Sequence, residues 1–186
     1  FNAWNATSHP LVSEGNGYWS ADINFVYAGA QYKYVITGPA STVWKNDARA
    51  RQLTNSVGNS IVANPNAYTW TTVNYTMPNW NELVIYEMHL GTFGQSASGL
   101  VPATFDNAKA KLDYLKDLGI NAVELMPICE FPGSVSWGYN YSFPYSVESG
   151  YGTPTDVKEF VDAAHARGIA VLGDLVYSHL GPNDLD

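Results

Sequence analysis

The chain has 186 residues and a formal net charge of -8, with only 9 Lys and Arg that form no cluster. This length suffices for one large domain or two small ones with a real core, while the scarcity of basic residues argues against a nucleic-acid partner. No apolar run approaches the length of a membrane-spanning helix, and the aromatic fraction of 14% suits flat apolar ligand faces such as sugar rings.

The first 76 residues show the signals of short β-strands. The stretches "GYWSADINFVYAG" and "AQYKYVITG" alternate aromatic or β-branched residues with small or polar ones, and period two gives four side chains shared faces: Val26, Tyr32, Tyr34 and Ile36. Only three or four strands are visible, where a sandwich has about seven. We therefore expect residues 1–76 to form an antiparallel, immunoglobulin-like β-sandwich that is incomplete at its N-terminus. Residues 54–70 predict a loop with one short strand at 60–63.

After residue 76 the pattern changes to alternating strands and helices. The nearly continuous apolar run at 83–89 is typical of a parallel strand covered on both faces. Residues 104–118 predict one helix, with Thr104 as its N-cap and Gly119 as its stop. Five of its side chains recur at helical spacing: Phe105, Ala108, Leu112, Leu115 and Leu118. Residues 121–127 predict a second strand.

A second helix is predicted from Thr153, which can cap it, with Pro154 in the first helical position and Asp156 three residues after the cap. Gly168 ends this helix, and residues 169–177 predict a third buried strand. Such alternation is typical of either a doubly wound sheet or a (β/α)8 barrel.

The loops favour the barrel. No predicted strand is followed by a glycine-rich phosphate loop, so we expect residues 77–186 to hold the first three strands and two helices of a (β/α)8 TIM barrel. A doubly wound sheet, with strand order 3-2-1 about a switch point, is the minor alternative. The long connection at 128–152 has the composition of a ligand wall, with five aromatic residues among Gly, Ser and Pro: Trp137, Tyr139, Tyr141, Phe143 and Tyr145.

Three polar residues near the end of the third strand are candidates for chemistry. Asp174 lies in an otherwise apolar strand, where a carboxylate needs hydrogen bonds or a cation, so it is a candidate site residue. His179 follows where the strand ends and can donate a hydrogen bond to a ligand hydroxyl. Ser178 beside it suggests a nucleophile, but adjacent residues at a strand end diverge, which argues against a Ser-His-Asp triad.

Glu87 and Glu124 each lie within a predicted buried strand. A pair of carboxylates is what glycoside hydrolysis requires, but both fall before the carboxyl ends of their strands. We interpret each as an inward-pointing group paired with a basic residue. His165 is expected to be a surface or packing residue of its helix, and Cys129 a buried thiol without a disulfide partner; neither belongs to a zinc-type ligand cluster.

The motifs together resemble a known family. The stretches "YEMHLGTF", "LKDLGINAVELMPICEFPG" and "SWGYNYSFPYSVESGYGTPTDVKEFVDAAHARGIAVLGDLVYSHLGP" resemble the first part of the catalytic barrel of the α-amylase superfamily, glycoside hydrolase family 13, in particular its glycogen or starch branching enzymes. The preceding "FNAWNATSHPL", "YKYVI" and "WKNDARARQ" resemble a carbohydrate-binding module of family 48. The resemblance covers nearly the whole chain and divides it into such a module at 1–76 and the barrel part at 77–186.

The resemblance implies roles for individual residues. Tyr139 matches the ring that stacks on the sugar in the reacting subsite, His179 the histidine that hydrogen-bonds that sugar, and Asp174 an aspartate that helps to position an arginine near the nucleophile. Where this chain has Ser178, many α-amylases have an Asn that ligates calcium. Some branching enzymes carry Ser, so this difference puts calcium in doubt, and no other cofactor is implied. It favours a 1,4-α-glucan branching enzyme over an α-amylase or debranching hydrolase.

The resemblance also implies a retaining double displacement on an α-glucan, whose nucleophile and acid/base follow later strands than these three. We therefore expect the chain to be the N-terminal portion of a longer cytoplasmic or secreted enzyme, with cytoplasm favoured, and to be inactive alone. Its oligomeric state is not specified, and no membrane partner is expected. A second hypothesis is a non-catalytic glucan-binding module that uses Trp4, Trp44 and the Tyr139 loop, which includes Trp137.

Overall fold

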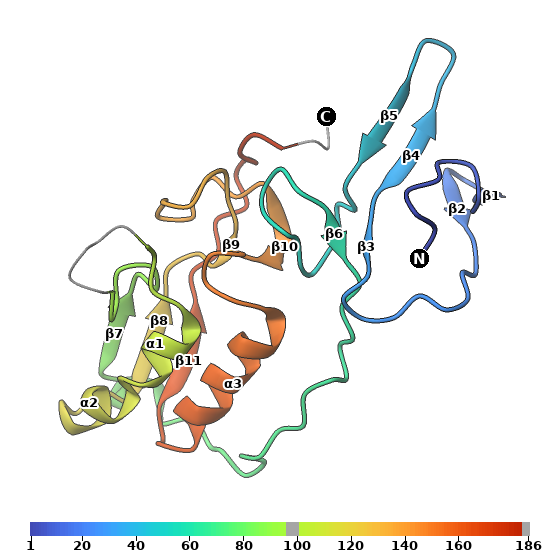
Figure 1. The fold of residues 1–186 in the computed structure, drawn as a ribbon. Helices are drawn as coiled ribbons and strands as arrows, with labels where there is room; N and C mark the ends of the chain where they lie inside the picture. The colour runs from blue at the N-terminus through green and yellow to red at the C-terminus, as the bar shows by residue number, and fades with distance from the viewer. Residues whose placement is uncertain (96–100, 184–186) are drawn as a thin grey trace.

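The structure is a computed structural model that describes residues 1–95 and 101–183. Its centre is a parallel sheet of three strands, β7 (Ile85–Met88), β8 (Ala122–Leu125) and β11 (Ala170–Gly173), in the order β11-β8-β7. Figure 1 shows the strands side by side with helices covering one face. Three of the strands expected from the sequence are therefore confirmed, and their consecutive order fits the start of a barrel as well as the start of a doubly wound sheet.

The two faces of this sheet differ in chemistry. Register pairs Glu87 with Glu124 and Glu124 with Leu172, so these residues share one face. The alternate residues face the helices and join the hydrophobic core; those with an exposed fraction of 3% or less are Met88, Val123 and Leu125. Burial of apolar side chains at roughly 25 cal/mol per Å² makes this core the main stabilising contribution.

The helices are α1 (Phe105–Lys109), α2 (Leu112–Asp117) and α3 (Pro154–His165). Both α1 and α3 begin with a reciprocal capping box: Thr104 with Asn107, and Thr153 with Asp156. The predicted cap of α3 is thus confirmed, including Pro154 at its start. No helix among the described residues is both long and apolar enough to cross a bilayer.

The single helix predicted at 104–118 is wrong in one respect, because it divides into α1 and α2. The amide of Lys111 donates to the carbonyl of Ala108, three residues back, which tightens the turn between them. Residues 104–118 contain no Gly or Pro, so helix propensity alone does not predict the break. Leu118, predicted on the apolar face, is 57% exposed.

The connection between β8 and α3 has structure of its own. It contains β9 (Cys129–Glu130) and β10 (Phe143–Val147), which pair antiparallel. Tyr141 and Phe143 are buried, at 2% and 0% exposed, so their predicted place in a ligand wall is wrong. Phe143 instead packs with Ala50 and Leu53 of the N-terminal part and joins the two halves of the chain.

The N-terminal part consists of three separate two-stranded antiparallel ladders. They are β1 (Val12–Gly15) with β2 (Tyr18–Ser20), β3 (Gln31–Tyr32) with β6 (Ser60–Ile61), and β4 (Tyr34–Thr37) with β5 (Thr42–Lys45). The β4–β5 hairpin projects away from the rest of the molecule (Figure 1). The described residues do not form the two packed sheets of a sandwich, and Val26 lies in no strand. Too few strands are present to enclose a core between sheets.

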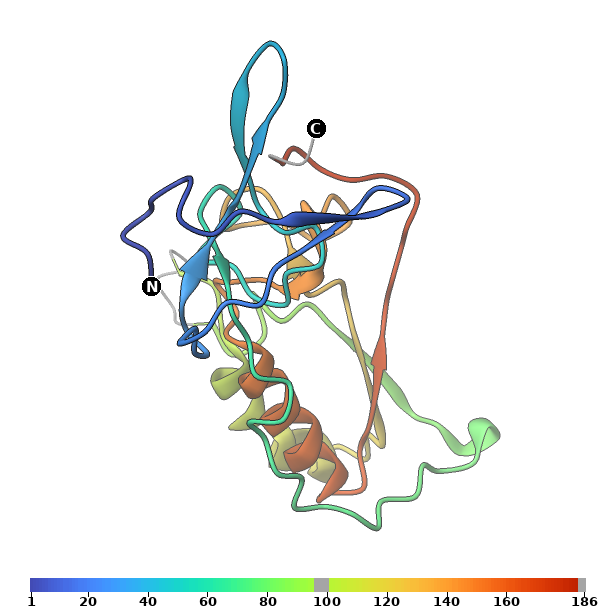
Figure 2. The same cartoon turned by 90° about the vertical axis from the view of Figure 1, so that its right-hand side faces the viewer.

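A strap of residues 64–76 runs along α3 before the short 3₁₀ helix η1 (Trp80–Glu82) leads into β7 (Figure 2). The carboxylate of Asp162 on α3 accepts hydrogen bonds from the Tyr68 hydroxyl at 2.7 Å, the Thr71 amide at 2.8 Å and hydroxyl at 2.7 Å, and the Thr72 amide at 2.8 Å.

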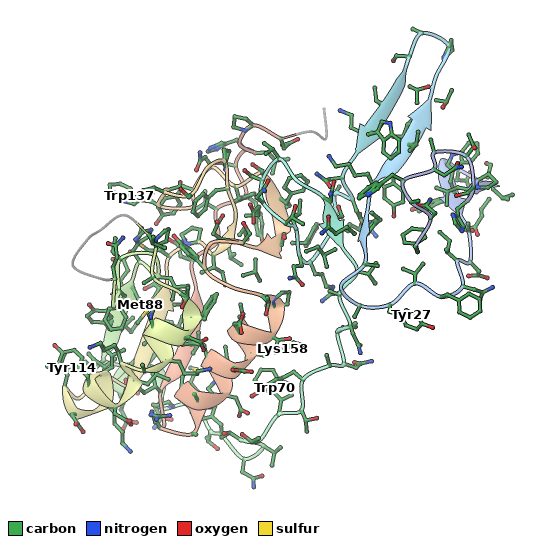
Figure 3. The ribbon with its side chains drawn as sticks, in the orientation of Figure 1. Tyr27, Trp70, Met88, Tyr114, Trp137 and Lys158 are labelled. Carbon is green, nitrogen blue, oxygen red and sulfur yellow. The ribbon has the colours of Figure 1, made fainter. Side chains whose placement is uncertain are left out.

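The ring of Tyr75 on the same strap stacks on His165 of α3, with 3.9 Å between centroids. His165 is therefore a packing residue, as predicted. Figure 3 shows Trp70 on this strap beside α3, which carries Lys158.

Candidate functional site

The structure brings together two of the predicted site residues, Tyr139 and Asp174. The Tyr139 hydroxyl donates to Asp174 Oδ2 at 2.6 Å, although 35 residues separate them. Asp174 lies just past β11, not inside the strand, and its amide donates to the Leu125 carbonyl at the end of β8. Both side chains are half-buried. The hydrogen bond fixes the tyrosine ring at the carboxyl ends of the parallel strands, where barrel sites form.

This contact also raises the pKa of the tyrosine, which is neutral at physiological pH with or without it. The hydrogen bond to Asp174 raises the pKa of Tyr139 to about 12, and desolvation and the charges of Asp174, Glu87 and Glu124 act in the same direction. The hydroxyl therefore remains a neutral donor at physiological pH. A neutral ring presents an uncharged, polarisable face, which suits the C–H face of a pyranose.

The loop that carries Tyr139 is shaped by its neighbours. Gly138 has a φ of +88°, and a Cβ there would collide with the carbonyl oxygen of Pro127, so only glycine fits this turn. The Ser136 hydroxyl accepts from the Gly138 amide at 3.0 Å and donates to Asn140 Oδ1 at 2.8 Å. The residues on both sides of Tyr139 are thereby held in place.

Glu87 and Glu124 lie next to each other on the face of the sheet that points away from the helices. Within residues 1–95 and 101–183, no ion pair joins either of them to a basic residue, so the expected basic partner is not found there. Asp174 follows two residues after Leu172 and therefore continues the same face. Three carboxylates thus gather on one side of the sheet, at and below the Tyr139 contact.

His179 lies apart from this contact. It is exposed, and its Nδ1 lies 2.9 Å from the Ser178 hydroxyl. In the part of the chain that the structure describes, no hydrogen bond joins His179 to Asp174, whose Oδ2 is occupied by Tyr139, so the three groups do not form a triad. The exposed Ser178 hydroxyl is a poorer calcium ligand than an amide carbonyl, and no three acidic, His or Cys groups converge among the described residues.

The three predicted glucan-binding tryptophans lie at two separate places. Trp4 and Trp44 lie together, with 6.3 Å between ring centroids, and are 48% and 41% exposed. Trp4 also lines a shallow hollow of about 270 Å³. Trp137 is 71% exposed and projects outward from the loop after β8, far along the chain from the other two (Figure 3).

Sequence analysis missed one polar residue beside the Tyr139 loop, His89, and a pair of buried carboxyl groups elsewhere, Glu130 and Glu148. His89 follows β7 directly, and its position at the carboxyl end of a parallel strand was the signal that could have identified it. Glu130 and Glu148 are buried at 0% and 1% exposed. Burial raises the pKa of Glu130 to about 7 with a further contribution from Glu148, and burial also raises the pKa of Glu148. Nothing in their local sequence signals a buried pair.

Comparison with known proteins shows which proteins this chain is similar to. A model of the alpha-amylase catalytic domain matches residues 103–184. The chain is 35% identical to malto-oligosyltrehalose trehalohydrolase of Saccharolobus solfataricus, over 94% of this chain and 29% of that protein. It is 33% identical to the 1,4-alpha-glucan branching enzyme of Thiobacillus denitrificans, over 99% of this chain and 26% of that enzyme.

A crystal structure from Salmonella typhimurium, solved as a candidate alpha amylase, superposes with a TM-score of 0.82 at 38% identity, over 92% of this chain and 28% of that one. The chain thus spans less than a third of the length of these relatives. The superposition favours the barrel over the doubly wound alternative. The chain has an α-amylase-like fold of the TIM-barrel superfamily, and its residues 103–184 match the model of the alpha-amylase catalytic domain.

Proposed function

We propose that the protein acts on α-1,4-linked glucans and that Tyr139 and Asp174 form part of the wall that binds the reacting sugar. The observation that carries this proposal is the 2.6 Å hydrogen bond between them. It holds the tyrosine by its hydroxyl, so that a ring face is available for stacking on a pyranose. His179 is proposed to reach the same sugar as a hydrogen-bond donor, with the cytoplasm as the expected compartment.

The proposed chemistry is a retaining double displacement. One carboxylate attacks the anomeric carbon and forms a glycosyl-enzyme, while a second carboxyl group protonates the leaving oxygen and then deprotonates the acceptor. Neither role is assigned to Glu87, Glu124 or Asp174. In this scheme the described residues bind and orient the glucan, and the neutral Tyr139 takes no part in proton transfer.

Replacing Tyr139 by alanine is expected to weaken maltoheptaose binding roughly tenfold or more, because stacking and its buried apolar area are both lost. Tyr139→Phe keeps the ring and should lose much less. Tyr145→Ala is the matched control, since Tyr145 lies in the same connection and is 64% exposed. Isothermal titration calorimetry measures all three. Equal affinity of Tyr139→Ala and the unchanged protein would remove Tyr139 from the sugar site.

Two acceptors for the glycosyl-enzyme are proposed. Ser178 supports transfer to a sugar 6-hydroxyl, as in branching enzymes, and the similarity to the trehalohydrolase of S. solfataricus supports water as the acceptor. Incubation of the protein from its whole gene with amylose and with maltotriosyltrehalose separates them. We expect either new α-1,6 branch points, seen by proton NMR, or release of trehalose. A folded preparation that forms no branch points, no trehalose and no new reducing ends from either substrate would contradict activity on α-1,4-glucans.

The non-catalytic alternative rests on the Trp4–Trp44 pair. Two tryptophan rings in contact and half exposed form a surface on which successive glucose units can stack. Retardation in glycogen gels that disappears in Trp4→Ala, Trp44→Ala supports this second glucan site, independently of Tyr139.

A further inference from the structure

We propose that His89 is a positioning residue that sets the place of the Tyr139 ring through the carbonyl of Ser136. This inference rests on the proposed function of Tyr139 as a sugar-stacking ring. His89 follows β7, Ser136 lies in the connection after β8, and the partner of Tyr139 follows β11. The chain of contacts therefore ties together the ends of all three parallel strands.

The first contact fixes the tautomer of the imidazole. His89 Nε2 lies 2.8 Å from the Ser136 carbonyl oxygen, and because a carbonyl can only accept, Nε2 carries the proton. Nδ1 lies 3.1 Å from the Thr92 hydroxyl, which holds the ring from the other side. Tyr151 Oη lies 3.2 Å from the same Nε2 and packs edge-on against the ring. The Tyr151 hydroxyl can share the Nε2 hydrogen bond, but at 3.2 Å it is a weaker acceptor than the Ser136 carbonyl at 2.8 Å.

The second step passes from Ser136 to Tyr139. The Ser136 hydroxyl bonds both the Gly138 amide and the Asn140 side chain, the two residues that flank Tyr139. A hydrogen bond that anchors the Ser136 backbone therefore restricts the loop immediately before the tyrosine. If this anchor is lost, the loop is free to move. Formation of the Tyr139–Asp174 hydrogen bond must then order the loop, which costs conformational entropy.

The chain offers a matched pair of variants. In His89→Gln the side-chain amide nitrogen reaches the place of Nε2 and can still donate to Ser136. In His89→Asn the amide is one methylene shorter, reaches only the place of Nδ1 and leaves the Ser136 carbonyl without its donor. Both variants are polar amides at a half-buried position, so their effects on folding are similar.

The readout is the side-chain NMR signal of Tyr139 in protein labelled with ¹³Cζ-tyrosine. Tyr139→Phe assigns the signal, and Asp174→Asn, which replaces the charged acceptor by a neutral amide, gives its position without the carboxylate bond. We expect the signal to stay in place in His89→Gln and to move to the Asp174→Asn position in His89→Asn. Tyr151→Phe, which removes only the hydroxyl near Nε2, should leave the signal unchanged.

Maltoheptaose binding provides a second arm. We expect the dissociation constant to rise roughly fivefold in His89→Asn and to stay near the unchanged value in His89→Gln, since preorganisation of the ring is what is lost. The NMR arm needs no glucan. A changed Tyr139 signal in His89→Asn without a changed affinity would contradict the sugar-binding role of Tyr139 and leave the positioning role of His89 intact. An unchanged Tyr139 signal in His89→Asn, or equal shifts in the Gln and Asn variants, would overturn the positioning role of His89.

Discussion

Replacement of Asp162 by asparagine is expected to release the strap from α3. The carboxylate is 3% exposed and accepts from three residues of the strap, Tyr68, Thr71 and Thr72. Asparagine has nearly the same shape, but its amide group turns two hydrogens toward the strap's own donors. At least one N–H or O–H is then left facing another donor, which costs more than the loss of a bond alone.

Chymotrypsin measures this release directly, because Tyr68 and Trp70 are cleavage sites within the strap. We expect cleavage there to be roughly tenfold faster or more in Asp162→Asn, since proteolysis follows the population of the opened segment. Glu159→Gln is the matched control: it lies on the same helix and loses only a partly exposed pair with Lys109. Equal cleavage of Asp162→Asn and the control would show that the strap is held by other contacts.

Acid should release the strap only at a pH well below 4. Hydrogen bonds from Tyr68 and Thr71 hold the pKa of Asp162 well below its usual range. A depressed carboxyl pKa contributes stability above the pKa of the unfolded chain, about 3.9, and this contribution is lost as the pH falls through the lower folded value. The Thr71 and Thr72 amides should therefore stay protected from hydrogen exchange, relative to an unfolded chain, at pH 4. In Asp162→Asn this protection should be lost at every pH.

Replacement of Glu130 by glutamine is expected to remove a pH dependence of stability. Burial raises the pKa of Glu130 to about 7, well above that of an unfolded glutamate at about 4.3. A raised carboxyl pKa contributes stability below the unfolded value, and this is lost as the pH rises through the folded value. Between pH 5 and 8 we expect the free energy of unfolding to fall by roughly 2 kcal/mol, since each pH unit between the two pKa values contributes at most about 1.4 kcal/mol.

Urea unfolding at pH 5 and pH 8 tests this. Glu130→Gln should lose most of the slope and be the more stable protein at pH 8. Both proteins share His165, whose pKa burial lowers, so their difference isolates the carboxyl group. A variant as pH-dependent as the unchanged protein would show that Glu130 titrates as an ordinary surface group.

Glu148 supplies the contrast. Its two oxygens accept from the amides of Phe131 and Gly150, which are obligate donors, at 3.1 and 2.9 Å. Those of Glu130 accept from the amide and the hydroxyl of Ser149, and a hydroxyl can also act as acceptor. Glutamine is therefore tolerated at position 130, whereas at 148 it places an amide hydrogen against a backbone donor.

The parts of the structure that the sequence predicts are those determined locally or by a strict period. The capping box of Thr153 and Asp156, the apolar run of β7 and the anomalous polarity of Asp174 each act within a few residues. The Tyr139–Asp174 contact was foreseen only as membership of one site through the family resemblance. No local pattern could supply the geometry that joins two side chains 35 residues apart.

Other features depend on partners distant in the chain. Phe143 is read from sequence as a ligand-wall aromatic, but Ala50 and Leu53 cover it. Residues 64–70 of the strap lie in the segment that the sequence predicts as a loop, because the partner of the strap's polar groups, Asp162, lies 90 or more residues away on α3. Burial and partner choice of this kind are tertiary properties, and neither composition nor periodicity encodes them.

The strap changes where the protein can be divided. A boundary at residue 76 separates the two patterns of the sequence, but it would cut Tyr68, Thr71 and Thr72 away from the helix whose carboxylate they satisfy. The Lys158 ammonium reaches further still, to the carbonyl of Pro65 at 2.6 Å. For truncation or fusion, the barrel half therefore begins near residue 64. The segment before its first strand is a component of that half, and any graft that omits it removes every strap group that donates to the Asp162 carboxylate on α3.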